Sequence, residues 1–328
     1  MDFKDYISKY KGQRIYIQTH NFPDPDALGS AYGLQTLCKH FDVDSTLCYD
    51  GKIDKLSTKK ILTEFNMEIF PKDEVPELNE NSFIILVDTQ KEAGNVTDFI
   101  GEEVACIDHH PTVKEIEYEY KDVRIVGACA TLITHYIKKY GIIPDTNTAT
   151  ALLYGIKMDT NHFNRGVTDK DIEAFAYLNP LVDNEKINSI ANNTMEFQDL
   201  TAYGASFDSI RVFDDIGIAY IPFPCQEALI AMISDFILAL EEVRFAVVYS
   251  KRDNGWKFSA RSEIAAMSAG EILHEVITPI GGNGGGHSCM AGGFIPMDII
   301  EEYGPNADHI ICDRIVEIAT KLRKDTYN

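Results

Sequence analysis

Three apolar runs in the first half of the chain lead directly into acidic or histidine-containing motifs. The runs span residues 14–18, 82–87 and 104–107, and their β-branched and aromatic content is typical of strands buried on both faces. Helical patterns lie between them at residues 26–40 and 56–66. Strands that alternate with helices predict a largely parallel sheet, and ligand-binding groups in such sheets gather beyond the carboxyl ends of the strands. The pattern therefore predicts an α/β fold with a functional site at that edge.

The motifs carry the side chains that divalent cations prefer. The first run leads into His-Asn-Phe-Pro-Asp-Pro-Asp at residues 20–26, and the second ends at an aspartate. The third ends at an Asp-His-His triplet, and a fourth aspartate closes a helical stretch at residues 146–157. Cations that activate water bind carboxylate oxygens and neutral imidazole, and one carboxylate bridges when two cations lie close together. We expect one paired-metal cluster built from six side chains: His20, Asp24, Asp26, Asp88, His109 and Asp159.

Each motif also has a simpler structural interpretation. Pro-Asp-Pro-Asp is a good turn sequence, and Asp26 is suited to capping the helix that follows it. Paired histidines after a strand are compatible with an ordinary loop. These interpretations do not explain why three consecutive strands end in ligand residues, and the joint pattern favours the metal site.

A glycine-rich segment in the second half predicts a phosphate-binding site. Residues 281–287 read Gly-Gly-Asn-Gly-Gly-Gly-His, and glycines expose backbone N–H groups and permit positive φ. We expect residues 287–292 to begin a helix whose dipole also favours an anion, with a flexible surface turn as the alternative. The expected phosphate contacts are Gly284, Gly285, Gly286, His287 and Arg261. Arginine suits phosphate through bidentate hydrogen bonds, although a solvated surface position explains Arg261 equally well.

The second half has its own alternation of strands and helices. Strands are predicted at residues 216–222, 243–250 and 257–262, with an amphipathic helix at residues 226–240. The polar residues 183–203 predict one connecting helix between the halves. We expect a substrate cleft with metals on one domain and phosphate-binding groups on the other. The expected boundaries are a first domain at residues 1–190, a connecting helix at 191–205 and a smaller α/β domain at 206–328.

Composition argues against several classes of function. The net charge is −21, from 51 acidic and 30 basic side chains, and such a surface repels long duplexes and long single strands. The glycine-rich segment lacks the Gly-Lys-Ser/Thr ending and the strand–GxGxxG–helix context of nucleotide-cofactor loops. Seven cysteines without regular spacing indicate reduced thiols and a cytoplasmic location. No signal peptide or membrane-spanning window is recognised, so no membrane partner is expected.

The Asp108-His109-His110 triplet and the Gly-Gly-Gly-His-x-x-x-Ala-Gly run at residues 284–292 are the basis of a family resemblance. The chain resembles the DHH phosphoesterase superfamily with its DHHA1 companion domain, in motif order and over nearly its whole length. Within the superfamily it resembles the compact nano-RNase/pAp phosphatase (NrnA-like) subgroup more than the longer RecJ-type exonucleases. The resemblance implies a DHH domain with a largely parallel sheet flanked by helices, joined by a connecting helix to a smaller α/β DHHA1 domain.

The resemblance also implies roles for individual residues. One divalent cation would be held by His20, Asp24 and Asp88, and the second by Asp26, Asp88, His109 and Asp159, with Asp88 bridging. The implied catalytic residues are His110, which would face the substrate, and Asp108, which would support the histidines. Manganese is the family's usual metal, and the ligand set also accepts magnesium.

One motif departs from the nano-RNase pattern. Many nano-RNases follow the fourth aspartate with Thr-Gly-Arg-Phe, whereas Asp159 is followed here by Thr-Asn-His-Phe-Asn-Arg. Asn161 and His162 replace the glycine and the arginine, and Arg165 is a candidate to restore the charge. This departure does not alter the expected metal-dependent chemistry, but it leaves the identity of the substrate undetermined.

Together these features predict a metal-dependent phosphoesterase. The expected substrates are oligonucleotides of about two to five residues and small nucleotides such as pAp or linear dinucleotides, because long-strand binding relies on basic grooves. A homodimer is a candidate assembly. Two alternatives stay open: an inorganic pyrophosphatase or exopolyphosphatase, and a non-catalytic nucleotide sensor.

Overall fold

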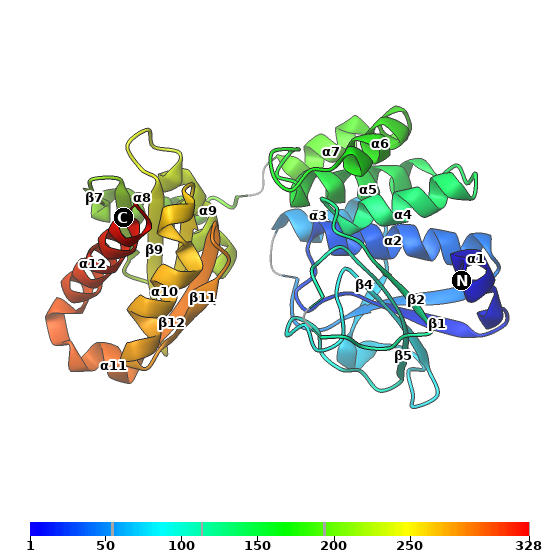
Figure 1. Cartoon of the computed structure of the whole chain (residues 1–328), viewed down its shortest axis with the longest axis horizontal. Helices are drawn as coiled ribbons and strands as arrows, with labels where there is room; N and C mark the ends of the chain where they lie inside the picture. The colour runs from blue at the N-terminus through cyan, green and yellow to red at the C-terminus, as the bar shows by residue number, and fades with distance from the viewer. Residues whose placement is uncertain (54–55, 113, 193–194, 328) are drawn as a thin grey trace. The chain divides into compact units, whose positions relative to one another are not determined.

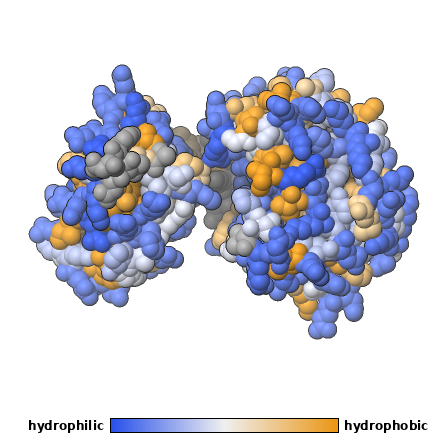
Figure 2. All heavy atoms as spheres, viewed as in Figure 1, coloured by the Kyte–Doolittle hydropathy of each residue, from blue (hydrophilic) through white to orange (hydrophobic). Residues whose placement is uncertain are grey.

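The chain forms two compact units, residues 1–194 and 195–328, each with one six-stranded sheet (Figure 1). The computed structural model describes residues 1–53, 56–112, 114–192 and 195–327. The face in Figure 2 is mostly hydrophilic with scattered hydrophobic patches, as expected for a net charge of −21. In the part of the chain that is described, no helix is long and apolar enough to cross a membrane. The expected α/β fold class is confirmed.

All six strands of the first sheet are parallel, in the order β3-β2-β1-β4-β5-β6. They are β1 Arg14–Gln18, β2 Asp44–Tyr49, β3 Ile69–Pro71, β4 Phe83–Val87, β5 Glu102–Asp108 and β6 Tyr120–Val123. The strand order reverses between β1 and β4, because the chain leaves β1 toward β2 on one side and β4 pairs with β1 on the other. In open parallel sheets, ligands bind beyond the carboxyl ends of the strands at such a switch point.

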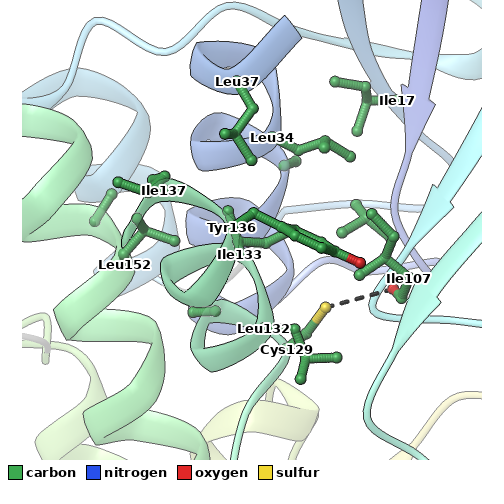
Figure 3. Close-up of a cluster of buried hydrophobic side chains, with 14 of the residues drawn as sticks. Ile17, Leu34, Leu37, Ile107, Cys129, Leu132, Ile133, Tyr136, Ile137 and Leu152 are labelled. Carbon is green, nitrogen blue, oxygen red and sulfur yellow. Dashed lines mark hydrogen bonds between the residues drawn. The ribbon is translucent and has the colours of Figure 1, made fainter. Parts of the chain in front are cut away.

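Helices cover one face of the first sheet. They are α1 Phe3–Ile7, α2 Pro25–His40, α3 Leu56–Glu64, α4 Cys129–Lys139, α5 Thr146–Asp159, α6 Asp169–Leu178 and α7 Asn184–Ala191, with short 3-10 turns at Ser8–Tyr10, Lys72–Glu74 and Asn179–Leu181. Helix α2 packs against β1, β2, α4 and α5. Figure 3 shows Leu34 and Leu37 of α2 in the same core as Ile133 of α4, where Cys129 Sγ donates a hydrogen bond to the Ile107 carbonyl (3.4 Å). This packing fixes the start of α2 and the end of α5 relative to the sheet edge.

Irregular segments cover the opposite face of the first sheet. The strand residues on this face are Tyr16, Cys48, Ile84 and Leu86. They pack against apolar side chains from the loops: Val75, Leu78, Val96, Phe99 and Tyr118. The strands are thus buried on both faces, which explains why their sequences are apolar runs rather than alternating patterns.

The second unit has a mixed sheet in the order β11-β12-β10-β9-β8-β7, in which only β8 and β9 pair in parallel among the described strands. The strands are β7 Arg211–Phe213, β8 Ile216–Ile221, β9 Phe245–Arg252, β10 Gly255–Ser262, β11 Asn283–Gly286 and β12 Met290–Pro296. The helices are α8 Asp199–Ser209, α9 Glu227–Leu238, α10 Ala269–Ile277, α11 Met297–Glu302 and α12 Ala307–Tyr327, with 3-10 turns at Ala265–Met267, Thr278–Ile280 and Gly304–Asn306. Helices α10 and α12 pack in one apolar core and α9 in another, so both faces of the sheet are covered.

The polar residues 183–203 do not form one connecting helix. Helix α7 ends at Ala191, and Asn192 has an extended backbone (φ −96°, ψ 162°). Helix α8 begins only at Asp199, and residues 193–194 lie outside the described residues. Helix α7 packs on α3 and α5 of the first unit, and α8 packs on β8 of the second. The prediction of a single helix is therefore wrong here, because asparagine side chains compete for backbone hydrogen bonds and end helices.

Candidate metal centre

Six side chains from five elements meet beyond the carboxyl ends of β1, β4 and β5. They are His20 after β1, Asp24 and Asp26 at the start of α2, Asp88 after β4, His109 after β5, and Asp159 at the end of α5. Three groups each have ligand atoms within 4.8 Å of one another. His20, Asp24 and Asp88 form the first, and Asp26, His109 and Asp159 the second. The third joins Asp88 and His109 to His110. The structure thus brings together all six residues that the sequence pattern singled out.

Asp88 lies between the first two groups. Its Oδ2 is 3.6 Å from His20 Nε2, and its Oδ1 is 3.4 Å from His109 Nε2. Its backbone has φ 61°, in the left-handed region that few residues other than glycine adopt. Its N–H donates to the Ile107 carbonyl at the end of β5 (3.0 Å). The chain therefore turns sharply at the end of β4, and the buried carboxylate reaches both histidines.

Backbone carbonyls orient the two histidine rings. His109 Nδ1 is 3.0 Å from the Val126 carbonyl oxygen, and His20 Nδ1 is 2.8 Å from the Asn21 carbonyl oxygen. Because a carbonyl oxygen only accepts hydrogen bonds, the neutral form of each ring carries its proton on Nδ1. Each ring then offers Nε2 to a cation, as in many histidine metal sites.

Asp24 and Asp26 are held by the starts of two different helices. Asp24 Oδ1 accepts hydrogen bonds from the N–H groups of Asp26 (2.9 Å) and Ala27 (3.0 Å), which makes it the N-cap of α2. The Asp26 carboxylate accepts from the N–H groups of Cys129 (2.6 Å) and Ala130 (2.9 Å) in the first turn of α4. The helix-capping and metal-site interpretations of these aspartates are therefore compatible, and Asp26 caps α4 rather than its own helix.

Close packing between α2 and α5 brings Asp159 to the cluster. A Cβ on Gly29 would lie 2.6 Å from a carbonyl oxygen of α5, and one on Gly155 would lie 3.1 Å from Asp26 Oδ1. Residues four apart share a helix face, so Gly155 and Asp159 both face α2. Asp159 Oδ2 lies 3.2 Å from His109 Nε2. The two glycines thus let the helices approach closely enough for Asp159 to join the group.

The segment that departs from the nano-RNase pattern forms a left-handed turn. Asn161, His162 and Phe163 have φ of 45°, 55° and 66°. Asparagine is one of the residues enriched in this region, so Asn161 keeps a turn that glycine also permits. Arg165 Nη2 then lies 2.8 Å from the Asp159 carbonyl oxygen and 3.6 Å from Asp159 Oδ1. The structure therefore places the Arg165 charge beside the cluster.

Asp108 and His110 form a hydrogen-bonded pair next to the cluster. His110 Nδ1 donates to Asp108 Oδ1 (2.9 Å), and Gln90 Nε2 donates to Asp108 Oδ2 (2.7 Å). Asp108 is buried, whereas half of the His110 side chain is exposed. Burial acts to raise the pKa of Asp108, but the hydrogen bonds from His110 and Gln90 outweigh it and lower that pKa. The bond to Asp108 raises the pKa of His110.

Crowded carboxylates shift the titration of the whole cluster. Burial, with repulsion from neighbouring carboxylates, raises the pKa values of Asp26 and Asp88 and brings that of Asp159 to about 6. Burial opposes the charged forms of His20 and His109, yet the nearby carboxylates raise their pKa values to about 10 and about 11. The protonated histidines therefore offset part of the carboxylate charge near neutral pH when no cation does so.

The donor set fits two divalent cations. Within the described parts of the chain, Asp88 Oδ1 and His109 Nε2 are buried without a hydrogen-bond partner, which is rare for polar atoms in protein interiors. Carboxylate oxygens with imidazole nitrogens are a donor set that Mn²⁺ accepts, and oxygen donors also suit Mg²⁺. One cation would be held by His20, Asp24 and Asp88, and the other by Asp26, Asp88, His109 and Asp159.

The glycine-rich segment of the second unit forms a β-hairpin. Strand β11 pairs antiparallel with β12, with Gly284 opposite Gly293 and Gly286 opposite Ala291. The expected helix at residues 287–292 is therefore wrong, and glycine's poor helix propensity is consistent with that outcome. A Cβ on Gly284 would lie 2.5 Å from the Leu273 carbonyl oxygen of α10. The glycines thus allow the hairpin to pack directly against α10.

The candidate phosphate-binding residues differ in how open they are. A Cβ on Gly285 would meet nothing within 4 Å, and Gly286 and His287 are exposed. The His287 N–H donates to the Met290 carbonyl (2.8 Å) and closes the hairpin turn. Arg261 lies on β10, two strands from β11, and its Nε donates to Asp235 Oδ1 (2.5 Å). Arg261 is thus paired with a carboxylate rather than simply solvated.

The sequence matches two known domains in the order in which the two units occur. Residues 14–156 match the DHH family, N-terminal domain, and residues 216–315 match the DHHA1 domain. The chain therefore carries a DHH domain followed by a DHHA1 domain. The resemblance in motifs and the α/β architecture of both domains are thereby confirmed.

Several known proteins are similar to this chain over most of its length. The uncharacterized protein MJ1633 of Methanocaldococcus jannaschii is 30% identical over 289 residues, which is 88% of this chain and 59% of that protein. The cyclic-di-AMP phosphodiesterase GdpP of Geobacillus thermodenitrificans is 25% identical over 307 residues, 86% of this chain and 44% of that protein. The bifunctional oligoribonuclease and PAP phosphatase NrnA of Thermus thermophilus is 26% identical over 302 residues, 88% of this chain and 86% of that protein. The chain thus spans 59% of the length of MJ1633 and 44% of the length of GdpP.

A solved structure shares the DHH–DHHA1 fold. The exopolyphosphatase-related protein from Bacteroides fragilis superposes with a TM-score of 0.77 at 18% identity, covering 98% of this chain and 97% of that chain. At this identity the similarity shows the fold alone.

Two features of the DHH domain had no signal in the sequence, and a third had a signal that the motifs did not use. Gln90 anchors Asp108, although nothing in the sequence around it marks that role. Asn21 and Thr97 exchange two hydrogen bonds, and Thr97 Oγ1 donates to Asp50 Oδ2 (2.5 Å), which ties three loops behind His20. Gly155 had a usable signal, because it lies four residues before Asp159 on the same helix face.

Proposed function

We propose that this chain is a metal-dependent phosphoesterase that hydrolyses short nucleotides, namely linear dinucleotides, short oligonucleotides and nucleotide phosphates such as pAp. The observation that carries the proposal is the position of Asp88, whose two oxygens lie 3.6 and 3.4 Å from the histidines of the two ligand groups. Catalytic metal pairs sit about 3.5–4 Å apart and share a bridging ligand, which this arrangement supports.

When bound, two cations in this centre activate water and take up charge on the phosphoryl group. The chain's own residues supply the proton chemistry. Asp108 fixes the His110 ring through Nδ1 and raises its pKa, so the ring stays protonated at higher pH. The half-exposed His110 then donates a proton to the leaving oxygen as a general acid. Gln90 keeps Asp108 in place and binds the His110 carbonyl as well (3.1 Å).

Charge and relatives support a short substrate. The net charge of −21 opposes the binding of long polyanions. GdpP and NrnA are named for reactions on a cyclic dinucleotide and on oligoribonucleotides and PAP, respectively. In this proposal the partly buried Gly285 and the exposed Gly286 and His287 of the DHHA1 domain bind a substrate phosphate, together with Arg261, whose Nε is paired with Asp235.

A substrate panel tests the proposal. Wild-type protein and the Asp88→Asn variant are assayed with Mn²⁺ on pAp, linear diadenylate, cyclic-di-AMP, short and long single strands, pyrophosphate and polyphosphate. We expect Asp88-dependent hydrolysis, with kcat/KM highest for a short nucleotide. Preference for pyrophosphate or polyphosphate would instead assign an inorganic phosphate hydrolase, and tight nucleotide binding without turnover would assign a sensor.

A further inference from the structure

An exposed phenylalanine lies between two residues of the metal centre. Phe22 is two residues from His20 and two from Asp24, so its Cα lies within about 7 Å of the Cα of each. The residue is 63% exposed. Single exposed apolar residues are common and need no explanation by themselves. The backbone of Phe22 is what makes it unusual.

Phe22 has φ 57°, in the left-handed region. Bulky residues rarely adopt this conformation because Cβ crowds the following carbonyl, whereas glycine and asparagine adopt it readily. Exposed turns are normally free to use those residues. A strained, exposed aromatic side chain at a functional site therefore indicates a role for the ring itself.

The structure holds the ring in a fixed position. The Phe22 N–H donates to the Asp50 carbonyl (3.0 Å), and the neighbouring Asn21 N–H donates to the Asn95 carbonyl (2.7 Å). A Cβ on Gly51 would lie 2.8 Å from two atoms of the Phe22 ring, so the ring rests directly on the Gly51 backbone. The ring is thus supported by backbone underneath while much of the residue stays open to solvent.

We propose that Phe22 is a stacking platform for a nucleobase of the substrate. This inference rests on the proposed function, because a phosphate bound at His20 and Asp24 would place its nucleoside beside this ring. Aromatic rings with an open face stack on bases of every type, and such stacking needs no positive charge. Stacking therefore suits a chain with a net charge of −21. Phe22 then favours nucleotides over pyrophosphate and polyphosphate, which have no base.

Three substitutions of Phe22 test the aromatic face, the apolar bulk and the backbone strain separately. Phe22→Trp keeps an aromatic face, Phe22→Leu keeps apolar bulk without one, and Phe22→Asn relieves the positive φ. Ile143→Ala is the matched control, since Ile143 is 81% exposed and lies between α4 and α5. Each variant is assayed with Mn²⁺ on linear diadenylate and on the same compound lacking its bases.

The expected result is a loss that depends on the base. Phe22→Leu and Phe22→Asn should lower kcat/KM for linear diadenylate by about 5- to 100-fold, mainly through KM, because base–aromatic stacking contributes on that scale. Hydrolysis of the abasic compound should change little, and Phe22→Trp and Ile143→Ala should match wild type on both. Phe22→Asn should keep or raise Tm, whereas a purely structural phenylalanine would lower Tm when replaced.

Equilibrium binding to the Mn²⁺-loaded protein separates this inference from the proposed function. If wild type binds linear diadenylate more tightly than the abasic compound but hydrolyses neither, the proposed function is overturned and the platform stands. If Phe22→Leu leaves the preference for the base unchanged, the platform is overturned. An equal loss on both compounds also overturns it, because Phe22 would then only shape the metal centre.

Discussion

Replacing Asp88 by asparagine should remove both cation sites at once. Its two oxygens are the atoms that approach both histidines, at 3.6 Å for His20 and 3.4 Å for His109. Asp24→Asn and Asp159→Asn are matched variants, since each residue belongs to one ligand group. Asparagine is as good an N-cap as aspartate, so Asp24→Asn preserves the start of α2. The three variants therefore differ in how many sites they remove.

The expected effect is large enough to measure by thermal unfolding. A cation at 100 times its Kd stabilises the folded state by about 2.7 kcal/mol, so two cations add about 5 kcal/mol. For a unit of 194 residues, each kcal/mol shifts Tm by about 2–4 °C, which predicts a gain of about 10–20 °C for wild type with Mn²⁺. Asp24→Asn and Asp159→Asn should keep about half of that gain, and Asp88→Asn almost none.

Without metal, Asp88→Asn should no longer lower Tm relative to wild type. Burial raises the pKa of Asp88 in the folded chain, so its charged form destabilises the fold above that pKa, and neutral asparagine removes this cost. Metal-free Asp88→Asn should therefore unfold at the wild-type Tm or higher. Calorimetric titration gives the number of Mn²⁺ ions bound by each variant. If Asp88→Asn still binds one ion with wild-type affinity, the bridging role of Asp88 is refuted.

Three further predictions concern pH and packing. Mn²⁺ affinity should rise as pH increases through about 6, where Asp159 loses its proton, and Mn²⁺ binding should release protons. Calorimetric titration in buffers of different ionisation enthalpy measures both effects. An affinity that does not depend on pH would contradict this prediction. Asp108→Asn should lower the pKa of His110 and move the alkaline limb of the pH–rate profile to lower pH; an unmoved limb would exclude His110 as the acid. Gly155→Ala should lower kcat about 10-fold or more, because its Cβ would displace Asp26 at the start of α2. Gly204→Ala in α8 is the control and should leave kcat unchanged, since a Cβ there meets nothing within 4 Å. Equal kcat values for the two variants would disprove the packing argument.

The parts of the fold that were predictable are those in which local pattern and tertiary environment agree. Strands β1, β4 and β5 were found to within two residues, because parallel strands buried on both faces are continuous apolar runs. The hairpin at residues 283–296 was not predicted. Strand β11 forms by pairing with β12, and its glycines carry no apolar pattern that would mark it as a strand. The break between α7 and α8 was missed because a polar helical pattern does not show which unit each half packs against.

The clustering of the six candidate ligands was predictable from the sequence, but the contacts that position them were not. Each ligand lies in a short motif beside a strand or helix end, and strand order brings those ends together. The bonds from α4 to Asp26 join residues 103 and 104 positions apart, which no local pattern reveals. Gln90 likewise acts on Asp108 across 18 residues. Motifs identify chemical groups, whereas their orientation depends on which distant elements become neighbours.

The caps formed by Asp24 and Asp26 affect how this protein would respond to metal shortage. Both carboxylates are fixed by backbone N–H groups at helix starts, so their positions do not depend on a cation. Small zinc domains, in contrast, unfold when their metal is removed. A chain built in this way would lose and regain its cations without refolding. Occupancy of the centre would then follow the supply of divalent metal directly, without a folding step in between.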